Sequence, residues 1–269
     1  MQVANLEDDT EHLNVLITGP SGTGKTTFAS SAPKSLYLAF ERQARAVVKK
    51  HQRESGVGSC VAMLFPETAE DIRAVVRAFH GPRDEPFRVV DKASGDIVLE
   101  CEWPETLVID SVTDAVKMIR DEIDRRVPLE FASDGFYDRN MRRRGAYREE
   151  SENMFRAVRD VGAHVIWLAI LDEGVDEASD GSKKRYAGPS LLAKTHRSAL
   201  MQTTNIAGVS RRRIHPPEQD DEGNVVREAW IEYAVQLVGP TYLPLKEYRP
   251  LDDIEVPDFS DWLSRIFPD

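Results

Sequence analysis

A glycine-rich octapeptide near the N-terminus restricts the possible folds of this chain more than any other segment. It matches G-x-x-x-x-G-K-[ST] at every position and lies between an apolar run, Leu13 to Thr18, and a helix-like segment, Thr26 to Ser31. In such a loop glycines let successive backbone N–H groups point at phosphates, a lysine reaches the β and γ oxygens, and a hydroxyl ligates Mg²⁺. We therefore predict a site for ATP and Mg²⁺ built from Gly19, Pro20, Ser21, Gly22, Thr23, Gly24, Lys25, Thr26 and Thr27.

Strand-like and helix-like segments alternate along most of the chain. Helical spacing is clearest from Thr68 to Phe79, where apolar residues recur at i, i+3, i+4 and i+7. The predicted strands are Leu13 to Thr18, Ser35 to Phe40, Cys60 to Phe65, Thr106 to Ile109 and His164 to Leu171. The other predicted helices are Arg42 to Lys50, Val112 to Val127 and Tyr147 to Val161. This alternation favours an α/β fold with a mostly parallel central sheet flanked by helices.

The remaining segments are expected to be additions to one domain that spans residues 1–269. A β-hairpin insert is predicted at about 86–103, because two strand-like runs flank a turn at Lys92 to Gly95. Pro128 to Tyr147 is polar and contains two glycines, so we expect a long loop there. The part from about 172 to 250 has short β-like stretches, and 258–267 is a short amphipathic helix.

Two carboxylates follow strands at the expected edge of the sheet. Asp110 ends the fourth predicted strand, where a P-loop protein needs an acidic partner for the Mg²⁺ shell, and an ordinary N-cap aspartate is the alternative. Ser111 follows it, so no glutamate beside the metal aspartate can act as the base. Glu41 comes directly after the second strand and is our candidate for orienting the attacking water, with a solvated helix-start glutamate as the alternative. Asp172 or Glu173 is next in line for that role.

Composition excludes several classes of protein. The 269 residues carry 35 Lys and Arg against 46 Asp and Glu, a net charge of −11, which is too acidic to coat duplex DNA by bulk charge. No apolar run approaches the roughly 20 residues of a membrane span, and the first residues are acidic, so we expect a cytoplasmic protein that has no membrane partner. The two cysteines, Cys60 and Cys101, have no metal spacing around them and are expected to be buried.

These motifs in this order resemble the RecA-core ATPases, and more narrowly the phage RecA-core single-strand annealing ATPases. The resemblance extends over about residues 10 to 250 and rests on the P-loop, Glu41, and the strand that ends in Asp110 and Ser111. It implies a RecA-like P-loop fold that hydrolyses ATP, binds single-stranded DNA in recombination or annealing, and self-associates as a ring or filament. A single-strand binding protein is a further candidate partner, and the cytoplasm of a host cell the expected location.

Two features depart from that family. Its members carry a polar sensor, Gln or His, at the end of the fifth strand, whereas this chain has Leu168 to Leu171 before Asp172. Their closing Lys-x-Arg motif, which reaches the neighbouring subunit's nucleotide, corresponds here to Lys246 and Arg249, with one extra residue between them. The resemblance implies that this pair acts in trans, and a solvated pair at a strand end is the alternative.

Basic residues gather in three places despite the acidic total. Arg142, Arg143 and Arg144 lie in the predicted polar loop among aromatic residues, a composition typical of a single-strand platform, so we take them as the candidate DNA contacts. A solvated loop paired with nearby glutamates is the alternative. Lys183 to Arg185 would be a finger toward a neighbour's ATP or a hairpin tip, and Arg211 to Arg213 a second DNA site or a charged edge strand.

Two other functions compete with this interpretation. A P-loop on a parallel sheet also serves small-molecule kinases, in which an arginine-rich loop would be a lid over the phosphates. A nucleotide-gated loader or scaffold that binds ATP with little turnover is the second rival. Gel filtration with ATP and single-stranded DNA tests the kinase, which should stay small and ignore DNA. A measured ATP turnover tests the loader, which should show little.

Overall fold

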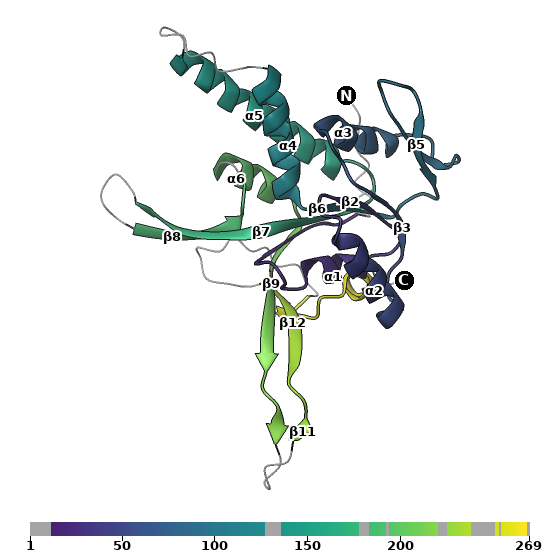
Figure 1. Ribbon diagram of the computed structural model, residues 1–269, viewed down its shortest axis with the longest axis vertical. Coiled ribbons are helices and arrows are strands. Elements are labelled where there is room, and N and C mark those ends of the chain that lie inside the picture. Colours follow the sequence, from purple (N-terminus) through teal and green to yellow (C-terminus); the bar gives the residue numbers. More distant parts are fainter. Residues whose placement is uncertain are drawn as a thin grey trace.

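The computed structural model describes residues 12–126, 136–177, 183–191, 194–219, 225–237, 251–252 and 254–267. Of residues 136–140, 176–177, 183–186, 194 and 219 it describes the backbone alone. The helices and strands are labelled in Figure 1, which shows a central sheet with helices on both sides and two long β arms that leave it.

The main sheet has nine strands within the described residues, in the order β13-β12-β9-β1-β7-β6-β2-β3, with β8 paired to β7. Its parallel strands are β1 (Asn14–Gly19), β2 (Ser35–Ala39), β3 (Cys60–Leu64), β6 (Thr106–Asp110), β7 (His164–Glu177) and β9 (Ile206–His215). Its antiparallel additions are β8 (Lys183–Pro189), β12 (Trp230–Gln236) and β13 (Ile254–Glu255). The α/β prediction with a mostly parallel sheet is therefore confirmed.

Alternate residues of each parallel strand supply the two layers of the core, because successive side chains of a strand point to opposite faces. Leu16 packs in one layer, while Val15 and Ile17 pack in the other. The first layer holds side chains of α3 (Ala69–Ala78), α4 (Val112–Arg126), α5 (Phe136–Arg159) and α6 (Lys194–Thr203). The second holds α1 (Lys25–Ser30), α2 (Ala44–Ser55) and α7 (Phe259–Ile266). The sheet is thus covered on both faces, as fully apolar parallel strands require.

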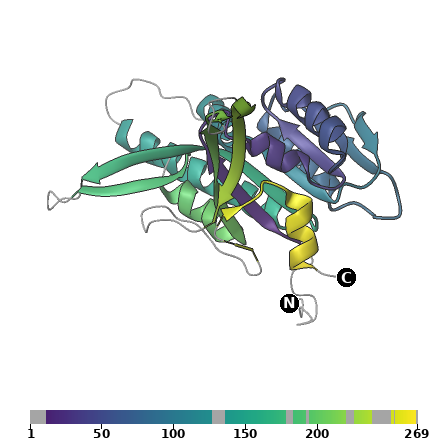
Figure 2. The ribbon, with the colours of Figure 1, turned by 90° about the horizontal axis from the view of Figure 1, so that it is seen from below.

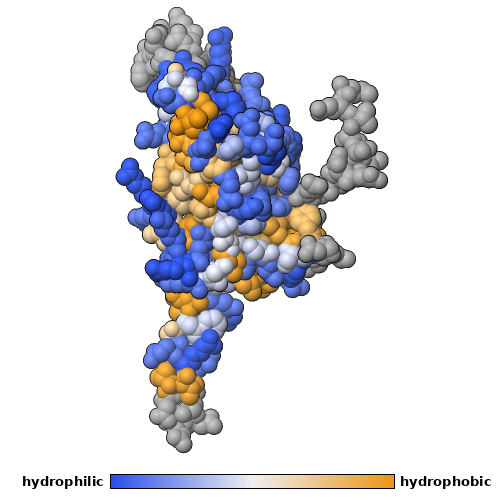
Figure 3. Space-filling view, turned by 90° about the vertical axis from the view of Figure 1, so that its right-hand side faces the viewer, coloured by the Kyte–Doolittle hydropathy of each residue, from blue (hydrophilic) through white to orange (hydrophobic). Residues whose placement is uncertain are grey.

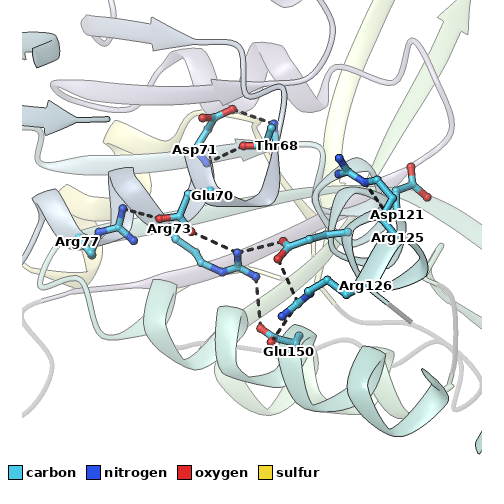
Figure 4. A network of polar contacts seen from close by, with 10 residues as sticks. Thr68, Glu70, Asp71, Arg73, Arg77, Asp121, Arg125, Arg126 and Glu150 are labelled. Carbon is cyan, nitrogen blue, oxygen red and sulfur yellow. Dashed lines mark hydrogen bonds and ion pairs between the residues drawn. The ribbon is translucent and has the colours of Figure 1, made fainter. Parts of the chain in front are cut away.

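Helix α3 is fixed at its start by a capping box and along its length by ion pairs. Thr68 accepts a hydrogen bond from the backbone N–H of Asp71, whose carboxylate accepts one from the backbone of Thr68. Arg73 then reaches across to α4 and α5, with its guanidinium 3.0 Å from Glu122 and 3.4 Å from Glu150 (Figure 4). Helices α3, α4 and α5 on this face therefore share one polar network.

Two long β arms extend from the sheet (Figures 1 and 2). One is β7 continued into its antiparallel partner β8, and the other is β9 paired with β12 and continued by β10 (Glu218–Gln219) and β11 (Val225–Arg227). The second arm exposes apolar side chains, among them Ile214 at 66% and Val226 at 64%, and apolar surface is visible along it in Figure 3.

The predicted hairpin insert is present as β4 (Phe87–Val90) and β5 (Ile97–Cys101). Among the described residues these two strands form a sheet of their own beside α3 and do not extend the main sheet. The C-terminal helix is also confirmed as α7, whose Phe259 and Trp262 are fully buried against Phe28.

Several sequence predictions were wrong in detail. The expected loop from Pro128 to Tyr147 is helical from Phe136 onward, while 127–135 lies outside the described residues. Helix α6 was not foreseen, and β7 runs to Glu177 rather than ending at Leu171. Cys60 and Cys101 are half-buried rather than buried, because each sits on a strand at the margin of its sheet. Within the described part of the chain, no helix has the length and apolar character needed to cross a membrane.

Candidate active site

The candidate site lies at the carboxyl ends of the parallel strands. Strand β1 ends at Gly19 in the P-loop, and β6 ends at Asp110. Strand β7 lies between them and places Ile170 beside Gly19 in the strand register. Strand β2 pairs with β6 so that Ala39 faces Asp110, which brings Glu41 to the same edge two residues later. The fold therefore gathers the P-loop and both predicted carboxylates at one place.

The P-loop backbone has the left-handed conformations that its glycines allow. Gly22 has φ of 76° and Gly24 has φ of 90°, values that residues with a Cβ rarely adopt. The loop is also packed from outside, since a Cβ on Gly24 would lie 2.8 Å from the ring of Tyr233 on β12. Ser210 of β9 donates its hydroxyl hydrogen to the carbonyl of Thr23. The arm formed by β9 and β12 thus buttresses the phosphate loop.

Lys25 begins helix α1 and folds back over the loop. Its ammonium donates to the carbonyl oxygens of Gly19 and Pro20, each at 2.8 Å. Burial lowers the pKa of Lys25, and the negative charges of Asp110 and Glu41 oppose that shift. The cation is therefore placed over the cradle with two carboxylates near enough to influence it.

Thr26 and Asp110 form the pair that a P-loop metal site requires. The Thr26 hydroxyl donates to Asp110 Oδ2 at 2.9 Å. Burial raises the pKa of Asp110, while the Thr26 hydrogen bond and Lys25 pull it down. Mg²⁺ is commonly held by one or two protein oxygens together with water and substrate phosphates, and this hydroxyl and carboxylate fit that pattern. They would hold the ion and shield the phosphate charge when a nucleotide is bound.

A cavity of about 410 Å³ opens over these groups. Glu41, Asp110 and Tyr233 all line it, so Glu41 shares the cavity with the P-loop as expected. The other lining residues are Ser21, Gly22, Gly24, Lys25, Thr26, Thr27, Gln43, Ala44, Val47, Ser111, Asp114 and Ile170. Asp172, the reserve candidate for the base, instead binds Arg197 of α6. The geometry therefore favours Glu41 over Asp172.

Residues 11–203 match a family described as an AAA domain. The chain belongs to this AAA-domain family. A chain of this family carries a P-loop fold that supports nucleotide binding and hydrolysis, which agrees with the cavity described above. No curated protein matches the sequence.

Solved structures that resemble the AAA-domain chain include a KaiC-like protein from the hyperthermophilic archaeon Pyrococcus horikoshii OT3. The two chains are 16% identical, and the match covers 88% of this chain and 80% of the other with a TM-score of 0.39. The family and the strand order support the expected P-loop ATPase class. The narrower resemblance to phage annealing ATPases is not among these findings.

Two residues of the site, Tyr233 and Asp114, were missed by the sequence analysis. Tyr233 arrives through the pairing of β9 with β12, and no local signal marks it. Ile170, which belongs to the apolar end of the fifth predicted strand, lines the cavity at 45% exposure. Asp114 lies one helical turn after Asp110, and the spacing D-S-x-x-D could have indicated it.

The predicted DNA contacts are separated by the structure. Arg142 and Arg144 are exposed on helix α5, whereas Arg143 is buried and forms an ion pair with Asp124 of α4. Arg143 is therefore a structural residue, because a helix presents neighbouring positions to different sides. The pair Lys246 and Arg249, predicted to act in trans, lies outside the described residues.

Proposed function

We propose that the chain hydrolyses ATP with Mg²⁺ at the P-loop and couples this to binding of single-stranded DNA, in phage-type recombination or annealing. The observation that carries the hydrolytic part is the convergence of Lys25, Asp110 and Glu41 on one cavity. Backbone amides and a lysine cradle phosphates, and a carboxylate activates water. Thr26 and Asp110 would hold a Mg²⁺ ion that neutralises phosphate charge. These are the parts that phosphoryl transfer to water requires.

The DNA-binding part is supported by the surface of α5 and α6. Exposed arginines line α5 at Arg142, Arg144, Arg148, Arg156 and Arg159. Between the two helices lies a polar groove of about 380 Å³, with Arg148 and Arg156 on one wall and Thr195 and Ser198 on the other. Cations and hydroxyl donors in one groove are suited to a phosphate backbone. Glu152 forms ion pairs with both Arg148 and Arg156, so it compensates part of the positive charge of the groove.

Helix α4 connects this surface to the nucleotide. Its first turn carries Asp114 in the ATP cavity, and its last turns carry Glu122 and Asp124, which bind residues of α3 and α5. A shift of α4 on nucleotide binding would therefore move the arginine face of α5. Self-association as a ring or filament is part of the same proposal, and the exposed apolar arm of β9 and β12 offers surface for it.

The catalytic role of Glu41 is tested by Glu41→Gln. We expect the variant to bind ATP with the wild-type affinity and to lose at least about a hundredfold in turnover, the usual scale for removal of a general base. Binding is measured with a fluorescent ATP analogue, and turnover by phosphate release. Turnover that stays at the wild-type level would exclude Glu41 as the base. A wild-type protein that binds ATP but does not hydrolyse it would favour the loader.

The DNA role is tested by replacing Arg142 and Arg144 together with alanine. For each phosphate that the variant no longer binds, the log–log dependence of single-strand affinity on salt should flatten by about 0.7. The matched control replaces Lys50 and Arg53, exposed residues at the far end of α2, and should leave the slope unchanged. An unchanged affinity and slope in the first variant would remove Arg142 and Arg144 from the DNA site and direct the test to Arg211 to Arg213. Loss of basal turnover without any DNA effect would favour the kinase.

A further inference from the structure

A hydrogen-bonded pair, Ser111 and Asp114, lines the ATP cavity at the start of α4, and the proposed hydrolysis assigns it no chemical role. The Ser111 hydroxyl lies 2.6 Å from Asp114 Oδ2, and both residues line the cavity together with Glu41. Lys117 donates to the other carboxylate oxygen of Asp114 at 2.8 Å. Ser111 is nearly enclosed, at 9% exposure. Lys117 and Ser111 thus each bind one oxygen of Asp114, and the pair lines the same cavity as Lys25 of the P-loop.

The chemistry of the pair fixes which partner donates. An ionised carboxylate can only accept, so the single hydroxyl hydrogen of Ser111 must point at Asp114. The Ser111 oxygen then presents lone pairs to the cavity. It can accept a hydrogen from water, but it cannot donate one to a phosphate oxygen. Asp114 therefore determines that Ser111 acts as an acceptor toward the cavity.

We propose that Asp114 is a positioning residue, which fixes Ser111 as a hydrogen-bond acceptor for the water that attacks the γ-phosphate. Glu41 accepts one hydrogen of that water and Ser111 accepts the other, which leaves an oxygen lone pair for the phosphorus. The water oxygen forms a bond to the γ-phosphorus, and the bond from that phosphorus to the bridging oxygen breaks, so that ADP leaves with the electron pair. One proton passes to Glu41, and the other hydrogen stays on the phosphate product. The inference rests on the proposed hydrolysis of ATP.

The test is the variant Asp114→Asn, whose amide can donate to Ser111 and turn the hydroxyl hydrogen into the cavity. We expect kcat to fall about tenfold to a hundredfold, the range of a hydrogen bond to a charged group, while KM for ATP stays equal or falls. Ser111→Ala should lose a similar factor, and the double variant should lose no more than the larger single loss. Asp114→Glu should recover part of the rate. Asp121→Asn, an equal charge change at an exposed site on the same helix, should leave kcat unchanged.

A second readout separates this idea from the proposed function. Asp114→Asn should weaken binding of ADP with aluminium fluoride, which mimics the transition state, and leave the affinity for an uncleavable ATP analogue unchanged. A wild-type protein without turnover would contradict the proposed function, and this affinity ratio would still report on the pair. Wild-type kcat and an unchanged ratio in Asp114→Asn would overturn the positioning role. Additive losses in the double variant, or an equal loss in Asp121→Asn, would overturn it as well. If Asp114→Asn does not fold, Ser111→Ala is judged by the same affinity ratio.

Discussion

Replacing Arg143 with alanine should destabilise the protein and leave the proposed DNA-binding surface of α5 intact. The Arg143 side chain is 9% exposed and forms an ion pair with Asp124, whose side chain is 36% exposed. Tyr147 donates its hydroxyl hydrogen to the same carboxylate, and its ring centre lies 6.0 Å from the guanidinium carbon. These contacts join α5 to α4, so their removal should loosen the helix pair.

The size of the effect follows from the burial of each partner. Removing one member of a buried ion pair costs about 3–5 kcal/mol, because it leaves a charge without a partner. Asp124 is more than a third exposed and keeps Tyr147, so water and that hydroxyl compensate part of the loss. We therefore expect the free energy of unfolding to fall by about 2 kcal/mol. For a chain of this size that corresponds to roughly 4–8 °C in Tm.

Urea unfolding without nucleotide measures this change. Arg142→Ala and Arg144→Ala are matched controls, because both side chains are exposed on the same turn of α5 and should shift stability by no more than about 0.5 kcal/mol. The double variant Asp124→Ala with Arg143→Ala should lose much less unfolding free energy than the sum of the two single losses. If Arg143→Ala keeps the wild-type stability and loses DNA affinity, the structural role assigned to this arginine is refuted.

Two further predictions concern the loop and the sheet. Gly24→Ala should destabilise the protein more than Gly22→Ala. Both substitutions incur about 1–2 kcal/mol of left-handed strain, but only the new Cβ at position 24 would lie 2.8 Å from the Tyr233 ring. Equal losses of unfolding free energy would contradict that contact. Burial lowers the pKa of His164 from 6.5 to about 4, so the unfolded chain takes up the proton at a higher pH than the folded one. The free energy of unfolding should therefore fall by up to about 3 kcal/mol as the pH drops from about 6.5 to 4. His164 Nδ1 accepts from the Leu13 N–H, and His164→Gln should flatten this dependence; an unchanged profile by urea unfolding would refute the assignment.

The parts of the fold that local chemistry determines could be predicted from the sequence. The P-loop residues must be glycines, lysine and threonine for reasons of backbone conformation and charge, so they are visible without any structure. Asp110 follows a strand of apolar residues, and parallel strands end at the same edge, which is why its bond to Thr26 could be anticipated. The strand alternation followed in the same way from apolar runs of strand length.

Long-range packing determines the parts that could not be predicted. Helix α5 begins at Phe136 although its first half is polar and contains Gly145, and contacts with α4 such as that of Arg143 with Asp124 hold it there. The position of Tyr233 depends on the register of β12 against β9, which places it opposite Arg212. No short sequence pattern encodes either contact, so Arg143 was mistaken for a surface residue and Tyr233 was overlooked.

Turnover of ATP by the Lys25→Ala variant tests the central claim most directly. The lysine is the only cation among the residues that line the described cavity, and its backbone neighbours form the cradle without it. We expect the variant to keep the wild-type unfolding transition and to lose ATP hydrolysis, both with and without single-stranded DNA. Hydrolysis at the wild-type rate in Lys25→Ala would show that the P-loop cavity is not the active site.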